Sequence, residues 1–376
     1  MVELAPRASL WESGRSSSHN DADVRGDPRL GLLGQLKGTW TNDGIFGRRM
    51  WNLIALPFGP ASSFPFQYRL LMNQGNERLR VSVGDLAAQN RGLDQRDQHV
   101  AALFYLQEIN QINAADAAAS DTSGGVTSPA TPDVNDTPKG DRLTPMPGVI
   151  DPSQVGIHKE SGIFFTLSGL AGPCDDLDAP GPRIGRLATI PHGDTVLAMG
   201  FDGPQFITPG PPNFDDPQLI AAFDALPEGL DDRDLSNPYL APYKFFADNP
   251  FKGVETRPGF PGFSSVAPLG LLKGSIERAF AGSQTTILET TTIHVDSDIS
   301  GNVSNIPFVN CEAQASKVTA VFWIQRLEVD GATRFALQYA QRVLLDFGQR
   351  FDGQPGRMRW PHITINTLIR SLDEDA

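Results

Sequence analysis

The side chains of this sequence best suited to chemistry are its histidines, of which there are six in 376 residues. His362 opens an alternating, strand-like run that ends at Arg370, close to the end of the chain, and His158 and His192 each lie beside a turn-forming sequence. A histidine fixed on a strand can bind a metal or a heme iron through one ring nitrogen, while the other nitrogen makes a supporting hydrogen bond. Such a residue can equally be a simple hydrogen-bonding group at a sheet end.

Other catalytic patterns are missing from the sequence. It contains no P-loop, G-x-G-x-x-G, H-E-x-x-H or G-x-S-x-G motif. Its acidic residues gather in loop-like runs such as 231–234, which are typical of solvated surface and lack the spacing of an EF-hand. Cys174 and Cys311 are far apart and form no C-x-x-C pair, so we expect two reduced thiols, with a single disulfide between them as the alternative.

Composition excludes several classes of partner. The net charge is −13 and the pI about 4.9, with no basic patch, so nucleic acid and an acidic membrane surface are not expected partners. No apolar stretch approaches the roughly 18 residues that a membrane span needs. The N-terminal residues lack the pattern of a signal peptide, and we therefore expect a cytoplasmic protein that binds a small molecule.

The pattern of strands predicts an all-β fold. Gly (37) and Pro (30) are abundant, which indicates a fold rich in turns. Four strand-length runs follow one another at 284–295, 317–329, 334–347 and 360–369, and Asp330-Gly331 between the middle two is a strong hairpin signal. The whole chain offers about eight to ten strands without a βαβ rhythm. We therefore predict an antiparallel closed or nearly closed β-barrel with long loop and helical insertions.

Changes in composition divide the chain. Residues 1–27 are expected to be a flexible tail, and 371–376 an acidic tail. Between them, 28–370 form a single β-barrel domain. Within it, 113–148 have almost no large apolar residues and are expected to be disordered, while 201–285 are rich in Pro and Gly and are expected to be a partly helical insertion packed on the barrel.

Four segments carry a family resemblance by their order. The run 38–44 (GTWTNDG) is similar to an opening G-T-W-x-G-x-G, and 157–163 (IHKESGI) to a strand H-x-E-[ST]-G-[YF]. The run 187–194 (LATIPHGD) resembles an apolar strand that ends in a His/Pro/Gly turn, and 362–370 (HITINTLIR) a closing H-L-x-A-x-L-x-R. Together they resemble the nitrobindin-type heme-binding β-barrel family. The sequence departs from its pattern at Asn366, where the family has alanine, and after the opening Trp.

The resemblance implies a cofactor and a site. The closing histidine of that family is the proximal ligand of a ferric heme at the barrel mouth, which implies that His362 binds the iron of heme b. The remaining candidates for the heme site are Thr39, Trp40, His158, Phe164, His192 and Arg370. Arg370 or Arg326 could hold a heme propionate, since arginine forms strong charge-assisted hydrogen bonds to carboxylates.

Alternation along the last strand attaches a condition to this hypothesis. Successive side chains of a strand point to opposite faces. One face therefore carries His362, Thr364, Asn366 and Leu368, and the other carries Ile363, Ile365 and Ile369. In a simple barrel the isoleucines would point inward, and His362 would then lie outside. The heme hypothesis therefore requires that part of 201–285, or a partner subunit, covers the isoleucine face. It would be contradicted if Ile363 and Ile365 were more than half exposed.

Three functions are compatible with this sequence. The first is a heme-binding barrel that acts on or senses nitric oxide, peroxynitrite or peroxide, whether as a peroxidase or peroxynitrite isomerase-like enzyme or without turnover. The second is a lipocalin-like carrier of a small hydrophobic ligand that contains no metal. The third is a structural barrel whose insertions form a homo-oligomer interface, since one fold serves many functions.

Overall fold

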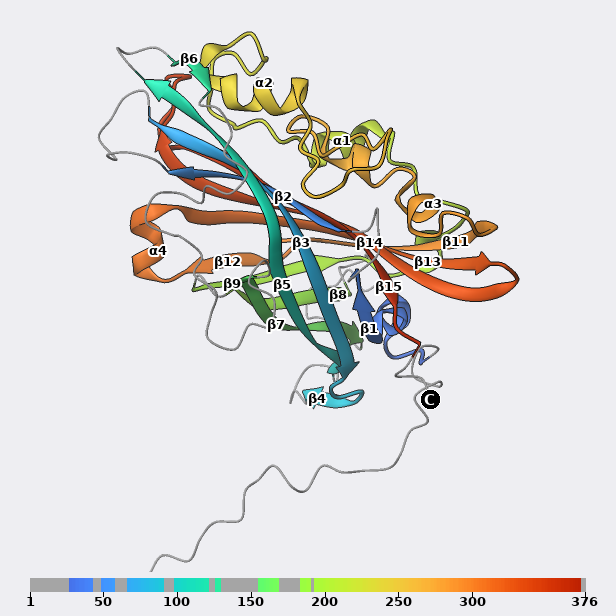
Figure 1. Cartoon of the computed structure of the whole chain (residues 1–376). Helices are drawn as coiled ribbons and strands as arrows, with labels where there is room; N and C mark the ends of the chain where they lie inside the picture. The colour runs from blue at the N-terminus through green and yellow to red at the C-terminus, as the bar shows by residue number, and fades with distance from the viewer. Residues whose placement is uncertain are drawn as a thin grey trace, which may run out of the picture.

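A computed structural model shows the chain as a β-barrel with a helical insertion along one side (Figure 1). The structure describes residues 27–42, 49–57, 66–90, 98–121, 126–129, 155–168, 183–190 and 193–372. The predicted tails therefore lie almost wholly outside the described residues, as do His192, Cys174 and the greater part of 113–148.

The strands form one closed ring. Hydrogen-bonded neighbours follow the path β3-β2-β15-β14-β13-β11-β9-β8-β7-β5, and β5 also pairs with β3, which closes a ring of ten antiparallel strands. The pairing between β9 and β11 is the shortest of the ring, a single pair between Asp296 and Met199. The prediction of an all-β, antiparallel, closed or nearly closed barrel is confirmed. The strands are β1 Gly38–Thr41, β2 Met50–Pro57, β3 Tyr68–Val83, β4 Ala88–Asn90, β5 Gln98–Asp121, β6 Val126–Pro129, β7 Val155–Ser168, β8 Ile184–Ile190, β9 Asp194–Gly200, β10 Ile207–Pro209, β11 Thr285–Asp296, β12 Asn302–Asn305, β13 Gln314–Val329, β14 Ala332–Gln349 and β15 Arg357–Arg370.

The helices are short and lie mostly in the insertion. They are η2 Gly31–Leu36, η3 Pro204–Phe206, α1 Pro217–Ala222, η4 Pro238–Leu240, α2 Ala241–Asp248, η5 Pro268–Leu271, α3 Ser275–Ala279 and α4 Pro307–Glu312. Pro occupies the first or second position in most of them, where its missing N–H has no intrahelical acceptor to lose.

The hairpin between β13 and β14 forms where the sequence predicts it. Asp330 has φ 50° and Gly331 has φ 80°, so both central residues adopt the left-handed conformation that a tight hairpin turn needs. Asp330 tolerates this conformation better than most side chains, and Gly331 has no Cβ to oppose it.

One end of the barrel is closed by η2. Its own Leu33 and Leu36 are fully buried, and the Nε1–H of the fully buried Trp40 donates to the Leu36 carbonyl at 2.7 Å. The guanidinium of Arg370 lies 4.5 Å from the centre of the Trp40 ring. We call this end the closed end.

The insertion 201–285 covers the outer face of β2, β14 and β15 (Figure 1, yellow to orange). Its aromatic side chains share an apolar core with Ile363 and Ile365, which are 0% and 1% exposed. Trp51, on the same outer face, contacts the rings of Phe260 and Phe263 at 5.7 and 6.1 Å. The expectation that the isoleucine face of the last strand is covered is therefore confirmed, and the cover comes from the same chain.

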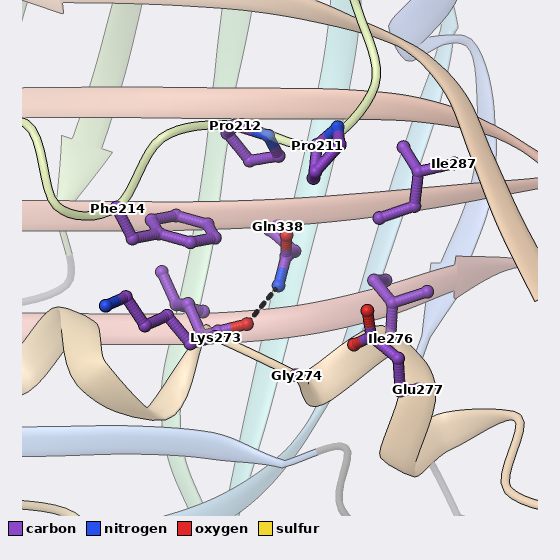
Figure 2. A pocket seen from close by; sticks show the side chains of 10 residues that line it. Pro211, Pro212, Phe214, Lys273, Gly274, Ile276, Glu277, Ile287 and Gln338 are labelled. Atoms are coloured by element: carbon purple, nitrogen blue, oxygen red, sulfur yellow. Dashed lines mark hydrogen bonds between the residues drawn. The ribbon is translucent and has the colours of Figure 1, made fainter.

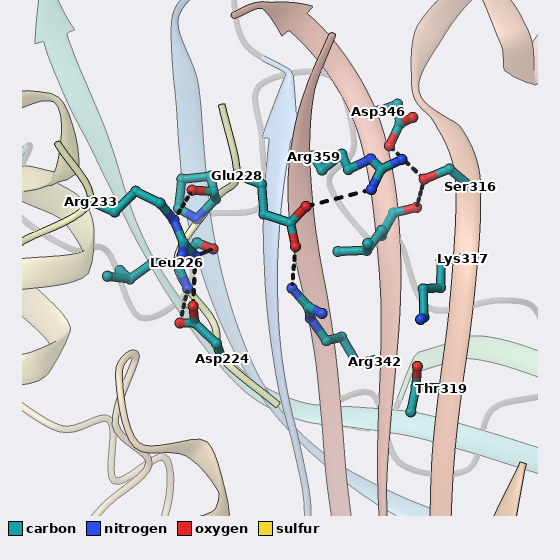
Figure 3. A network of polar contacts seen from close by, with 12 residues as sticks. Asp224, Leu226, Glu228, Arg233, Ser316, Lys317, Thr319, Arg342, Asp346 and Arg359 are labelled. Carbon is teal, nitrogen blue, oxygen red and sulfur yellow. Dashed lines mark hydrogen bonds and ion pairs between the residues drawn. The ribbon is translucent and has the colours of Figure 1, made fainter. Parts of the chain in front are cut away.

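Glu228 anchors the insertion to the barrel (Figure 3). Its backbone N–H donates to the Arg359 carbonyl at 2.8 Å, and the Arg359 N–H donates back at 3.1 Å, which adds a short bridge beside β15. Its carboxylate accepts from Arg342 Nη2 at 3.0 Å and lies 3.6 Å from Arg359 Nη1. Because Arg342 is largely buried, this contact fixes the insertion more firmly than an exposed ion pair would.

The expectation that 113–148 are disordered is wrong for residues 113–121 and 126–129, which are strand. β5 continues to Asp121, with its residues up to Ala118 paired to β3, and β6 adds a short strand beside it. The prediction rested on the scarcity of large apolar residues, and it failed because the packed positions here are filled by small side chains. Ala115 and Ala117 are buried in the outer core, and α2 lies against this part of β5.

Candidate functional site

His362 lies on the inner face of β15. Asn366 and Leu368, which share its face by alternation, are buried inside the barrel, and the neighbour opposite His362 on β14 is Val343. On the other side, the pairing of β15 with β2 begins at Ile363–Leu53, one residue after His362. The imidazole is partly exposed. It therefore stands at the margin of the lumen, where the ring of strands begins to open.

A layer of polar side chains crosses the lumen below His362, and we call it the septum. Its members are Glu77, Tyr105, Gln107, Glu160, Arg186, Tyr339, Gln341 and Asn366, from β3, β5, β7, β8, β14 and β15. Arg186 Nη1 donates to Gln341 Oε1 at 2.5 Å, and Tyr339 donates to Glu77 Oε2 at 2.5 Å. These bonds join strands that are not neighbours in the sheet, so the side chains meet in the middle of the barrel.

Glu160 is the anionic centre of the septum. It is 1% exposed and accepts from Arg186 Nη2 at 2.6 Å, from the Tyr105 hydroxyl, and from His158 Nε2 at 3.2 Å. Burial by itself would raise the pKa of this carboxyl, but the Arg186 charge and the hydrogen bonds outweigh it and lower the pKa to about 2. Glu160 is thus ionised at neutral pH, and the same contacts raise the pKa of Arg186.

Glu77 is the second carboxyl of the septum, and its environment acts in the opposite direction. Burial raises its pKa, although Tyr339, Gln107 and Asn366 all donate to it. The side-chain oxygen of Asn366 in turn accepts from Asn42 Nδ2 at 2.9 Å. The two buried carboxyls therefore differ in pKa because only Glu160 has a guanidinium in contact.

The septum divides the lumen into two halves. Toward the closed end the inner face is apolar and buried, with Phe164 packed against Tyr105 and Phe322 at 5.0 and 5.5 Å between ring centres. Toward the other end several inner-face residues are partly exposed, and we call this the accessible half, although Arg69 and Asp116, which form an ion pair on the same inner face, are buried. Its partly exposed inner-face residues include Ile54, Leu71, Gln111, His158, His362 and Thr364.

A row of amides lines the accessible half just above the septum. The Thr364 hydroxyl lies 3.4 Å from Asn52 Oδ1, Asn52 donates to Asn73 at 3.2 Å, and Asn73 donates to Gln111. The row runs across four adjacent strands, β15, β2, β3 and β5. Each amide carries two N–H groups, and one hydrogen bond along the row uses only one of them, so further N–H groups can face a ligand.

Of the residues that the sequence singled out, two line the accessible half. His158 and His362 both face the accessible half. Thr39, Trp40 and Arg370 lie at the closed end, and Arg370 is eight residues beyond His362, about 26 Å along the strand at ~3.3 Å per residue. Arg370 instead stacks on Trp40 and Phe335 and donates to the Gln35 carbonyl. Trp40 thus plugs the barrel floor, Phe164 is part of the closed core, and His192 lies outside the described residues.

Sequence reasoning missed most of the septum. Tyr105 and Gln107 alternate on β5 with residues of the opposite face, as do Tyr339 and Gln341 on β14. Polar residues at inward positions of otherwise apolar strands were the available signal. Their mutual contacts depend on strands far apart in the sequence, which no local pattern reports.

A separate cavity of about 200 Å³ lies outside the barrel, between the insertion and the sheet (Figure 2). Pro211, Phe214 and Lys273 line it, and Gln338 forms part of its wall. Gln338 is engaged already, since its Nε2 donates to the Leu272 carbonyl at 2.9 Å and to Ser275 Oγ at 2.6 Å. The polar side chain in the wall of the cavity thus holds the insertion on the barrel.

Two further observations concern metals and membranes. Within the described ranges, no group of three or more His, Cys, Asp or Glu side chains is arranged to hold a metal ion. A heme iron needs only one axial side chain, so this finding concerns ions bound directly by the protein. Among the helices of the described segments, none has the length and apolar character needed to cross a membrane.

Comparison with known proteins gives no family. No family model matches the chain, and no curated protein is similar to it. Among solved structures, the chain has a faint likeness to the β domain of the Bordetella autotransporter BrkA, with 8% identity, a TM-score of 0.14, and coverage of 89% of this chain and 99% of that one. At that TM-score the likeness carries no argument about fold or function, and the site has to be interpreted from its own geometry.

Proposed function

We propose that this protein is a heme-binding β-barrel that acts on or senses small oxidants, with His362 as the axial ligand of the iron. The observation that carries the proposal is the orientation of β15. Alternation with Asn366 and Leu368 assigns His362 to the face of β15 that lines the lumen, and the opposite face, with Ile363 and Ile365, is buried under the insertion.

The residues around His362 would give a flat group apolar contacts on one side and polar contacts on the other. Val343 lies beside the imidazole on β14, and Ile54 and Leu71 present partly exposed apolar side chains on the same inner surface. One imidazole is sufficient as a protein ligand to a heme iron. A bound heme would supply an iron that coordinates nitric oxide, peroxynitrite or peroxide.

The anchoring of the propionates differs from the expectation that Arg370 or Arg326 holds them. Arg370 is at the closed end, and Arg326 is paired with Glu289 at 3.1 Å, on the side of the barrel where β10 and β11 meet. Hydrogen-bond donors nearer to His362 come from the amide row of Asn52, Asn73 and Gln111. We therefore expect neutral amides to meet the polar edge of the group, since the guanidinium of Arg69, on the same inner face, is already paired with Asp116.

The filled lumen disfavours the carrier hypothesis. A lipocalin-like carrier needs a deep apolar cavity, whereas here the septum crosses the lumen and the half beyond it is packed with buried side chains such as Phe164 and Phe322. A hydrophobic ligand without a metal would have only the accessible half, whose floor is polar, whereas a heme in the same space would also gain the bond from the imidazole of His362 to the iron.

Titration with hemin tests the proposal. We expect the wild type to give a sharp Soret band at one equivalent and His362→Ala to lose it. His294→Ala is the matched control, because His294 is an exposed histidine on the outer face of β11. Equal binding by the wild type and His362→Ala would refute the assignment of the ligand. Absence of a Soret band together with uptake of an apolar dye would favour the carrier, and a defined oligomer with neither would favour the structural role.

A further inference from the structure

Glu160 of the septum orients a histidine, His158, to which the heme proposal gives no chemical role. His158 is on β7, and in the ring of ten strands β7 lies four places from β15 in one direction and six in the other, so the two strands face each other across the lumen. Thr166, near the other end of β7, contacts the Arg29 carbonyl at the closed end. His158 therefore stands on the accessible side of Glu160, on the wall opposite to His362.

The contact with Glu160 fixes the tautomer of this imidazole. Glu160 is ionised, and a carboxylate can only accept hydrogen bonds, so His158 Nε2 must carry the proton that it donates at 3.2 Å. In the neutral ring, Nδ1 then holds the lone pair. No described residue forms a hydrogen bond with Nδ1, and the side chain is 20% exposed.

The carboxylate is itself held rigidly. Glu160 Oε1 takes the hydrogen bonds of Arg186 and Tyr105, while Oε2 is left for His158. Arg186 Nε also donates to the Tyr105 hydroxyl at 3.0 Å, and its guanidinium lies 5.7 Å from the centre of the Phe322 ring. A base oriented by a buried carboxylate, which is oriented in turn by a third group, is the arrangement that general acid–base catalysis requires.

We propose that His158 is an acid–base residue for a small protic ligand, such as a hydroperoxide or peroxynitrous acid, bound in the accessible half of the lumen. This inference rests on the proposed function in placing that ligand beside His362. His158 Nδ1 takes the proton of the ligand's O–H group: the O–H bond breaks, an N–H bond forms, and the electron pair stays on oxygen. The imidazolium that results is balanced by Glu160, and the proton returns to the product by the reverse transfer. Glu160 and Arg186 are positioning residues in this scheme.

Cyanide and nitric oxide separate this role from a structural one. Hydrogen cyanide must lose a proton to bind a heme as the anion, whereas nitric oxide has none to lose. In the hemin-loaded protein, we expect His158→Asn to slow cyanide association by about 10²-fold, in line with the usual contribution of a general base, and nitric oxide association by no more than about twofold. Glu160→Gln should slow cyanide by a smaller factor, and His294→Asn should change neither rate. A cyanide rate that falls no further than the nitric oxide rate would overturn the proposal.

The tautomer gives a second measurement that needs no heme. Nitrogen-15 NMR of the imidazoles in the hemin-free protein should show His158 protonated at Nε2 in the wild type and mixed between tautomers in Glu160→Gln. A wild-type His158 protonated at Nδ1 would overturn the inference, since the nitrogen facing the ligand would then lack its lone pair. A protein that binds no hemin would refute the proposed function and with it this inference, whereas a protein that binds hemin but holds His158 in the Nδ1-protonated form would refute the inference alone.

Discussion

Replacing Glu160 by Gln should destabilise the barrel strongly at neutral pH and weakly in acid. The pKa of this carboxyl is about 2 in the folded protein, against an ordinary value of 4.5. A difference of that size corresponds to about 3 kcal/mol of folding free energy at ~1.4 kcal/mol per pH unit. Removing the charge also leaves Arg186, 5% exposed, without its counterion, and breaking a buried pair in this way typically costs ~3–5 kcal/mol.

The sign of the pH dependence follows from the direction of the shift. A carboxyl whose pKa is lowered by folding stabilises the native state above its unfolded pKa and loses that contribution as the pH falls from about 4.5 toward 2. Glu77 works in the opposite sense, because its pKa is raised by folding. The informative quantity is therefore the difference between wild type and variant, since Glu77 is common to both.

Urea denaturation of both proteins between pH 7 and pH 3 measures this difference. We expect a gap in unfolding free energy of about 3–5 kcal/mol from pH 7 to pH 5, which narrows as the pH falls below 4.5. Glu289→Gln is the matched control, because its partner Arg326 is partly exposed and such pairs contribute less than about 1 kcal/mol. A gap that stays constant down to pH 3 would show that Glu160 is not the ionised centre of the septum.

Three further changes test the parts that position the site. Ile365→Ala should lower the unfolding free energy by about 2–5 kcal/mol in urea, because the side chain is 1% exposed in the outer core; a cost under 1 kcal/mol would show that the insertion does not pack there. Glu228→Gln should cost about 1–2 kcal/mol and speed limited proteolysis within 201–285, and an unchanged cleavage rate would argue against its anchoring role. Gly331→Ala should cost about 1 kcal/mol by thermal unfolding, because φ is 80° at a position with nothing within 4 Å of an added Cβ; a neutral effect would contradict that turn geometry.

Local patterns in the sequence were sufficient for the barrel but not for the length of its strands. Asp330-Gly331 and the runs around it predicted the C-terminal hairpin, because turn chemistry and side-chain alternation act over a few residues. The same reasoning ended β5 too early. Ala115 and Ala117 resemble a disordered sequence until β3 pairs with them and α2 covers them, and both contacts come from distant parts of the chain.

The site, like the fold, was determined partly by local sequence pattern and partly by tertiary contacts. The sequence by itself determined that His362 shares a face with Asn366 and opposes Ile363 and Ile365, because the period of a strand is two. It could not decide which of these faces is inside. The tertiary structure decided this, because an insertion rich in aromatic residues gives the isoleucines an apolar surface outside the barrel. Inside, Arg186 and Glu160, from different strands, could be buried only together, since either charge alone would be too costly to remove from water.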